Sequence, residues 1–341
     1  MSPEQWAPRG RFAFVGPGWV LACAIGCGSQ AATPTSPAPD PGPADSQGCA
    51  RTSVGLTPLV DMGASEYRGE PGGLYGSGAN VAPPAHLDAG VALARGIQRR
   101  DADGQPSPTG RYAFVSIGMS NTTQEFRAFI PLATADPDRD PGLAIVDGAQ
   151  GGMTAADWAA PGCACWSRLD DRLREAGVSA AQVAAVWVKL ANRQPSSGWP
   201  AYARALADDT IGVVRLLKAR FPNLRLAYLS SRIYAGYATT TLNPEPYAYE
   251  SGFATRWAIL DQITGAPSLA YAGANAPAPW LAWGPYLWAD GLRARGDGLT
   301  WSCGDLQADG THPSPAGREK VAQRLLGFLR TDPTAREWYL R

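Results

Sequence analysis

Four short, continuous apolar runs constrain the fold of this chain more than any other feature. They cover residues 111–117, 143–146, 183–190 and 224–229, and each is followed within two residues by a glycine or a polar residue. Such runs, without polar alternation, are typical of strands buried on both faces of a parallel sheet. Between the third and fourth runs, residues 202–220 place Leu206, Val214 and Leu217 near helical spacing. Strands alternating with helices predict one doubly wound α/β domain.

The last helix is the most clearly marked. Ser314 is a good N-cap, Pro315 suits the first helical position, and Val321, Leu325 and Phe328 share one face. In doubly wound folds, ligands bind at the loops after the carboxyl ends of the strands. We therefore expect reactive residues in those loops and in the loop before this helix.

The N-terminus has the pattern of an export signal. Arginines precede a mostly apolar segment, residues 12–25, which is too short and too broken by glycine and proline for a membrane span. Small residues before a cysteine resemble the lipobox of bacterial lipoproteins, in which that cysteine carries the lipid. Cys27 fits better than Cys23, because the apolar segment then has fuller length. We expect a lipoprotein signal peptide over residues 1–26 and a lipid anchor at Cys27, which is the protein's only expected link to a membrane. A plain signal peptide with incidental cysteines is the alternative.

From this signal we expect the protein to be located on the bacterial cell envelope, at the periplasmic side or the cell surface. Residues 27–48 are rich in proline and alanine and have almost nothing to bury, which predicts a disordered tether. Residues 49–341 are expected to form the folded domain, with an irregular extension over residues 49–110.

The folded domain contains four cysteines, and export makes disulfides possible. They are Cys49, Cys163, Cys165 and Cys303. Cys163 and Cys165 are too close in sequence for a relaxed bond to each other, so we expect one of them to reach Cys303. The full pairing stays open.

Charge and histidine content limit the classes of function. Lys+Arg and Asp+Glu both number 30 and no basic tract is present, so no nucleic-acid partner is expected. The chain has only two histidines, His86 and His312, which argues against a metal site. His86 follows a Pro-Pro pair in a poorly patterned region and is expected to be structural.

Two loops carry groups suited to nucleophilic catalysis. Ser120 stands in a Gly-Met-Ser-Asn tetrapeptide directly after the first apolar run, where a helix is expected to begin. Its backbone N–H there favours developing negative charge, although serine is also an ordinary helix cap. His312 precedes the last helix, with Asp309 three residues earlier. An aspartate at that spacing can bind Nδ1 and leave Nε2 to accept the serine proton. A surface histidine in a turn is the alternative.

Two further loops contain possible oxyanion donors. Gly151 and Gly152 follow the second apolar run, and glycines let backbone N–H groups approach an oxyanion closely. Asn192 follows the third run, and its side-chain amide could donate to the same oxyanion. Each signal is weak alone, because Gly-Gly turns and loop asparagines are common.

The order of these four loops resembles that of the SGNH (GDSL-type) serine hydrolase family over about residues 111–330. Within the family, the tetrapeptide around Ser120 and the Gly-Gly pair followed by Trp158 are similar to sialate O-acetylesterases and related acetylxylan esterases. The resemblance implies a flavodoxin-like, three-layer α/β/α sandwich with a mostly parallel central sheet. It implies no metal and no organic cofactor.

The resemblance also implies a role for each site residue. Ser120 is the nucleophile, His312 the base and Asp309 the acid of the triad. The oxyanion hole would use the Ser120 N–H, the Asn192 amide and a glycine N–H. That glycine is Gly152, or Gly151 if the register slips by one residue.

Later loops contain candidates for substrate contacts. Arg232 and Tyr234 follow the fourth apolar run, and Trp283 and Trp288 lie in a tryptophan-rich stretch. These loops should rim the same edge of the sheet, where the side chains could bind a sugar; simple packing is the alternative. The leading hypothesis is an exported esterase acting on a small ester or acylated carbohydrate, including O-acetyl groups. The alternatives are an acyltransferase with the same serine and histidine, and a non-catalytic envelope protein that binds glycans.

Overall fold

The computed structural model describes residues 49–273 and 275–341, so the predicted signal peptide, the tether and Cys27 lie outside the described residues. The domain is built on a five-stranded sheet. Its strands are β3 (Tyr112–Gly118), β4 (Leu143–Asp147), β5 (Val183–Lys189), β6 (Leu226–Ser230) and β7 (Trp280–Trp283). Their order is β4-β3-β5-β6-β7, and every neighbouring pair is parallel. This is the flavodoxin-like order, and it confirms the predicted doubly wound fold.

The first four strands of this sheet coincide with the four apolar runs, and their side chains are almost all buried. The sequence does not predict the fifth strand, because residues 280–283 lie in a tryptophan-rich stretch that we expect to form a loop. They instead pair with β6, where Trp280 lies opposite Leu226. Large aromatic side chains suit strands, and here they are buried at the end of the sheet.

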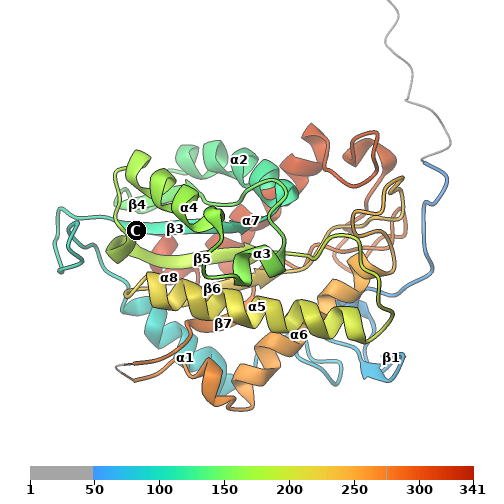
Figure 1. The fold of residues 1–341 in the computed structure, drawn as a ribbon, viewed down its shortest axis with the longest axis horizontal. Coiled ribbons are helices and arrows are strands. Elements are labelled where there is room, and N and C mark those ends of the chain that lie inside the picture. Colours follow the sequence, from blue (N-terminus) through green and yellow to red (C-terminus); the bar gives the residue numbers. More distant parts are fainter. Residues whose placement is uncertain (1–48, 274) are drawn as a thin grey trace, which may run out of the picture. The chain divides into compact units, whose positions relative to one another are not determined.

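Helices cover both faces of the sheet, as expected for three layers. One mutually contacting group contains α1 (Pro84–Arg95), α2 (Ser120–Ala135), α7 (Pro315–Thr331) and α8 (Arg336–Tyr339). The other contains α3 (Ala155–Ala159), α4 (Ala164–Glu175), α5 (Ala201–Arg220) and α6 (Tyr247–Ile263). Figure 1 shows α4 and α5 in front of the sheet and α7 behind it.

Helix α7 begins as predicted, because the Ser314 side chain accepts a hydrogen bond from the Gly317 N–H and Pro315 occupies the first turn. Helix α6 was wrongly expected to be irregular. It is buried on nearly every side, so its sequence lacks the polar face by which an amphipathic helix is recognised.

Much of this burial comes from the N-terminal extension. A short hairpin of β1 (Glu66–Tyr67) and β2 (Glu70–Pro71) stacks Tyr67 on Phe253 of α6. Glu70 binds Arg256 of the same helix at 2.6 Å. Single 3₁₀ turns lie at Leu59–Asp61, Ala180–Gln182, Pro267–Leu269 and Cys303–Asp305.

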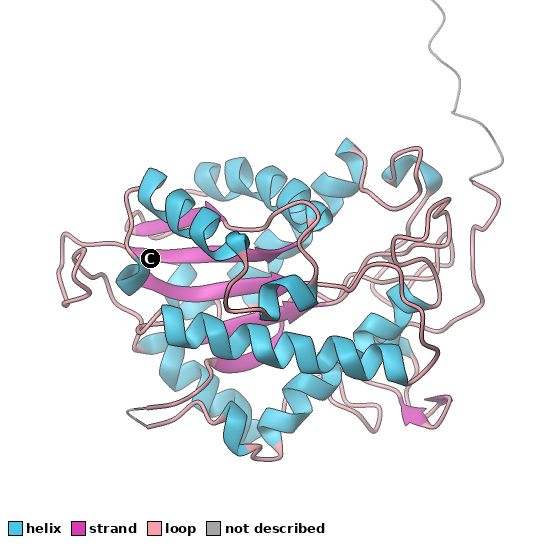
Figure 2. Ribbon diagram, in the orientation of Figure 1, coloured by secondary structure: helices cyan, strands magenta, loops and turns pink. Residues whose placement is uncertain are grey.

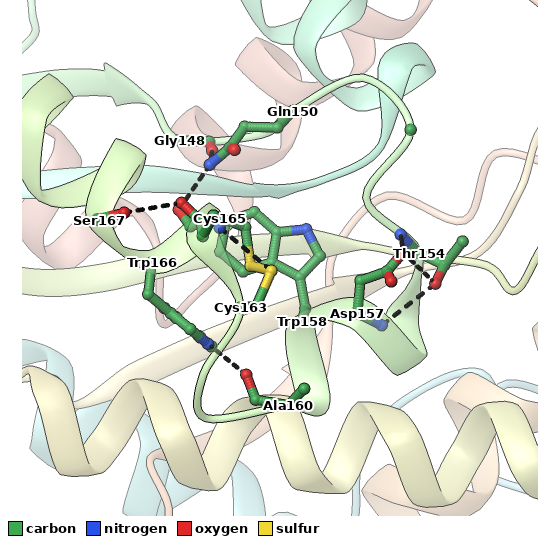
Figure 3. The surroundings of a disulfide bond; sticks show 12 residues. Gly148, Gln150, Thr154, Asp157, Trp158, Ala160, Cys163, Cys165, Trp166 and Ser167 are labelled. Atoms are coloured by element: carbon green, nitrogen blue, oxygen red, sulfur yellow. Dashed lines mark hydrogen bonds between the residues drawn. A yellow bond between two sulfur atoms is a disulfide. The ribbon is translucent and has the colours of Figure 1, made fainter.

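The cysteine pairing differs from the expectation. Cys49 bonds to Cys303, and Cys163 bonds to Cys165. Cys163 is the extended N-cap of α4, so its Cα lies 5.1 Å from that of Cys165, within the span of a disulfide. Figure 3 shows this bond beside Trp158, with the Gln150 side chain donating to the Cys165 carbonyl.

Within the described part of the chain, none of the helices combines the length and the apolar character needed to cross a membrane.

Candidate active site

Four predicted site residues follow four adjacent strands of the sheet. Ser120 follows β3, Gly151 follows β4, Asn192 follows β5 and Arg232 follows β6. Because all five strands are parallel, these ends meet at one edge, toward which the arrowheads point in Figure 2. The chain reverses its direction of travel across the sheet between β3 and β5, which is where doubly wound folds bind ligands.

Ser120 is the first residue of α2, immediately after the buried strand β3. The first backbone N–H groups of a helix have no partner within the helix, so the Ser120 N–H is available to an external acceptor. The side-chain Oγ lies 2.8 Å from Nε2 of His312. The sequence separates these two residues by 192 positions, and the fold brings them into hydrogen-bond contact.

The loop that carries His312 is fixed at several points. Asp309 accepts a hydrogen bond from Nδ1 of His312 at 2.5 Å through one oxygen. Its other oxygen accepts from the backbone N–H groups of Thr311 and His312. The side chain of Asn121, next to Ser120, donates to the Thr311 carbonyl at 2.9 Å. The ring is thereby held with Nε2 toward Ser120.

The hydrogen bonds of Asp309 also set its ionisation. Partial burial alone would raise the pKa of this carboxyl, but the bonds from the His312 ring and from two backbone N–H groups lower it below its ordinary value. Asp309 is therefore ionised at neutral pH. An ionised carboxylate at Nδ1 stabilises the imidazolium that forms when Nε2 takes a proton.

The two candidate glycines differ in their distance from Ser120. A β-carbon built on Gly151 would lie 3.9 Å from the Ser120 Cβ, whereas one on Gly152 would meet no atom within 4 Å. Gly152 has a left-handed φ of +81°, and its carbonyl accepts from Arg193 at 2.6 Å. The geometry thus favours Gly151 as the glycine that faces the Ser120 side chain, which is the alternative register.

Asn192 is held by both ends of its amide. Its Oδ1 accepts from the Ala156 N–H at 3.0 Å, and its Nδ2 donates to Asp209 of α5 at 2.5 Å. Because the backbone N–H requires an acceptor, this contact fixes which end of the amide is oxygen. Nδ2 carries two hydrogens, so one remains for an oxyanion. Burial raises the pKa of Asp209, which the Asn192 bond partly offsets.

These groups share one small pocket. Ser120, His312, Asn192 and Arg232 all line a cavity of about 30 Å³. About 10–15 Å³ is the smallest cavity that holds one water molecule. The enclosed part of the pocket therefore accommodates only a few non-hydrogen atoms.

The structure corrects the aromatic part of the predicted substrate contacts. Tyr234, Trp283 and Trp288 are buried, at 0%, 4% and 0% exposure. Their polar atoms bind the protein itself: Tyr234 donates to the Arg51 carbonyl, Trp283 to the Leu74 carbonyl and Trp288 to Glu245. These three rings pack in the core instead of rimming the pocket. Arg232 does line the pocket.

His86 lies away from this pocket, on α1. Its Nε2 is 2.8 Å from the Leu281 carbonyl and its ring stacks on Trp280. Burial lowers the pKa of His86. No cluster of three or more metal-ligating side chains is present among residues 49–273 and 275–341.

Three residues at the site were missed by the sequence analysis. Asp209 lies in the middle of a helix, and Asn243 lies in a long loop with no motif around it. Neither position has a local signal, because both reach the site through the fold. Asn121 belongs to the same Gly-Met-Ser-Asn tetrapeptide as Ser120, but its contact with the histidine loop depends on residues far along the chain.

No protein-family model and no curated protein matches this chain. Among solved structures, it is similar to a protein described as an acylhydrolase from Bacteroides fragilis (13% identity, TM-score 0.38, 72% of this chain and 96% of the other). It is also similar to an acetylxylan esterase from Geobacillus stearothermophilus (15%, 0.38, 67% and 97%). A third is the periplasmic domain of a lipopolysaccharide acetyltransferase from Salmonella ser. Paratyphi A (12%, 0.36, 71% and 95%). At such identities no residue role is transferred from these proteins to this chain.

Proposed function

We propose that this chain is a serine esterase that hydrolyses short-chain acyl esters, including O-acetyl esters of carbohydrates. The observation that carries the proposal is the continuous hydrogen-bond relay from Ser120 Oγ through His312 to Asp309. Ser120 and His312 line a pocket that Asn192 also lines. Nucleophile, base and orienting acid in hydrogen-bond contact are the geometric signature of an activated serine.

The reaction follows from these positions. His312 Nε2 removes the Ser120 proton as Oγ attacks the ester carbonyl, and Asp309 stabilises the imidazolium. The negative charge on the carbonyl oxygen is bound by the Ser120 N–H, the Gly151 N–H and the free hydrogen of Asn192 Nδ2. His312 then gives its proton to the leaving alcohol. Water, activated by the same histidine, releases the acyl group and restores Ser120.

The small volume of the pocket favours a short acyl chain. The cavity of about 30 Å³ encloses only a few atoms in all, so a long fatty acyl group has no enclosed site beside Ser120. We therefore expect acetyl esters to be hydrolysed faster than octanoyl esters of the same alcohol.

The test is hydrolysis of 4-nitrophenyl acetate by the purified protein. Ser120→Ala and His312→Ala should each lower kcat/KM by at least about 10³-fold, because the triad acts as a unit. Ser167→Ala is the matched control: this exposed serine on α4 lies outside the pocket, and its removal should leave activity unchanged. All variants should show a single cooperative thermal unfolding transition, which establishes that they fold.

A folded parent protein that hydrolyses no short-chain ester would contradict the proposal. Acyl transfer to an added sugar that outpaces hydrolysis would instead assign the same triad to an acyltransferase.

We also propose that the protein is exported and anchored through lipid on Cys27. The Cys49–Cys303 disulfide supports an oxidising compartment, because disulfides are rare in the cytosol. Cys27→Ala should move the protein from the detergent phase to the aqueous phase on detergent partitioning of cells. A variant that stays in the detergent phase would count against lipidation there.

A further inference from the structure

Arg232 is buried at the wall of the active-site pocket with hydrogen-bond donors that bind nothing in the protein. It follows β6, is 5% exposed and lines the same cavity as Ser120. Its Nε and Nη2 atoms are buried and have no hydrogen-bond partner among the described residues. A buried guanidinium normally forms several such bonds, so its unused donors indicate a missing partner.

The carboxylates around Arg232 are already engaged elsewhere. Both oxygens of Glu125 bind the Lys189 ammonium at 2.6 Å. Glu245 accepts from the Ala235 N–H and the Trp288 indole. Burial lowers the pKa of the Arg232 guanidinium, but arginine stays charged in proteins. Asp309, the third carboxylate that acts on Arg232, is bound by His312. The pocket wall therefore contains a desolvated positive charge that no anion among the described residues pairs directly.

A second group beside it has the opposite polarity. Asn243 also lines the pocket and is 2% exposed. Its Nδ2 donates to the Asn192 carbonyl at 2.9 Å and to the Tyr202 hydroxyl, which itself donates to that carbonyl. These contacts fix the amide orientation and leave Oδ1 buried with no donor. The wall thus combines an unused cation with an unused acceptor.

A ligand that satisfies both groups carries an anion and a hydrogen-bond donor. A carboxylate matches the planar fork of the guanidinium. The Asn243 Oδ1 requires an O–H or N–H and would repel a second anionic oxygen. A neutral sugar would satisfy the asparagine but leave the arginine without a counter-charge, which is the costlier omission.

We propose that Arg232 and Asn243 form a subsite for a hydroxy acid, so that the ester cleaved at Ser120 belongs to an acylated sugar acid. The carboxylate of the alcohol part binds Arg232, and a neighbouring hydroxyl donates to Asn243. Water adds across the ester bond, releasing the short-chain acid and the free sugar acid. This inference rests on the proposed function of Ser120.

The experiment compares two esters that differ in charge. One is O-acetylated methyl glucuronoside, and the other is O-acetylated methyl glucoside. The measured quantity is the ratio of kcat/KM for the acidic ester to that for the neutral ester. We expect the parent protein to prefer the acidic ester by at least about tenfold, since buried charge-assisted hydrogen bonds are strong. Arg232→Gln should abolish this preference, and Arg232→Lys should restore part of it.

Arg193→Gln is the matched control. Arg193 lines the same pocket, but its side chain is 50% exposed, so solvent screens its charge. Its removal should change the ratio by no more than about twofold, whatever it does to the absolute rates. A preference that disappears equally in both variants would show non-specific attraction and overturn the subsite.

The outcomes separate the two proposals. A parent protein that cleaves both esters equally well overturns the subsite and leaves the esterase intact, even if Arg232→Gln fails to fold. Loss of rate on both esters in Arg232→Gln, at an unchanged ratio, also overturns it. A parent that cleaves neither these esters nor 4-nitrophenyl acetate contradicts the esterase itself.

Discussion

Asp209 offers a test of how the oxyanion hole is built, because it touches Asn192 and no reacting atom. Its carboxylate accepts from Asn192 Nδ2 at 2.5 Å, while the Ala156 N–H holds the other end of the amide. We predict that Asp209→Ala lowers kcat for a neutral acetyl ester and leaves KM nearly unchanged. The reason is that an oxyanion donor acts in the transition state more than in the bound substrate.

The size of the effect follows from the two anchors. Loss of an oxyanion donor typically costs about 10²–10³-fold in kcat, and Asn192→Ala should fall in that range. Asp209→Ala keeps the amide and its contact with Ala156, so only part of the orientation is lost. We expect a loss of about 1.4 kcal/mol of transition-state stabilisation, which is about tenfold. Asp209→Asn, which can still present a neutral acceptor, should lose about two- to fivefold.

The assay is steady-state hydrolysis by the two single variants and the double variant. If Asp209 acts through Asn192, then Asp209→Ala should cost little once Asn192 is alanine, and the two effects should fail to add. Asp208→Asn is the matched control, because Asp208 is the adjacent, exposed carboxylate on the same helix. Full additivity of the two losses, or an equal loss in Asp208→Asn, would refute the positioning role.

Three further predictions concern stability. The hydrogen bonds of Asp309 lower its pKa by more than burial raises it, so the ionised carboxylate stabilises the fold above about pH 3.8. The difference in unfolding free energy between the parent and Asp309→Asn should therefore shrink as the pH falls below that value, which urea unfolding at graded pH measures. The Glu125–Lys189 pair is fully buried, so Lys189→Met alone should lower the free energy of unfolding by about 3–5 kcal/mol. Adding Glu125→Leu should recover part of that loss. Equal losses for the single and double variants in urea unfolding would contradict this. Removing the Cys49–Cys303 bond, which spans 254 residues, should cost about 2–5 kcal/mol. A reductant, which also breaks Cys163–Cys165, should lower the Tm of the parent by at least as much as replacing Cys49 and Cys303 with serine does.

The parts of the fold that the sequence predicts are those with a local pattern. Strands β3 to β6 are continuous apolar runs, and α7 has its own cap and first-turn proline. The contact between Asp309 and His312 was predictable because the two residues are only three positions apart, whereas their contact with Ser120 depends on the fold.

The rest depends on long-range packing. Helix α6 has no polar face, because the N-terminal extension covers what would have been its exposed side. The side chains of Trp283 and Trp288 looked available for sugar binding because a sequence does not reveal whether a loop or a buried strand carries them. Their burial was decided by partners such as Leu74, which lies about two hundred positions away.

The site itself shows the same division. The sequence left Gly151 and Gly152 open, and only the distance to Ser120 distinguishes them. Asp209 and Asn243 had no motif, since long-range packing alone brings Asp209 to Asn192 and Asn243 to the pocket wall. Cys163 and Cys165 were misjudged because the extended backbone at the start of α4 separates them enough to bond.

The separation of 192 residues between Ser120 and His312 has a consequence for how the protein matures. The histidine loop and α7 leave the ribosome, or a membrane pore, only after the whole sheet has done so. If the proposed function holds, a partly emerged chain contains Ser120 without its base and cannot hydrolyse esters before the domain is complete. Ester hydrolysis should then appear together with native tertiary structure in a refolding experiment, so the rate of product formation serves as a clock for the last step of assembly.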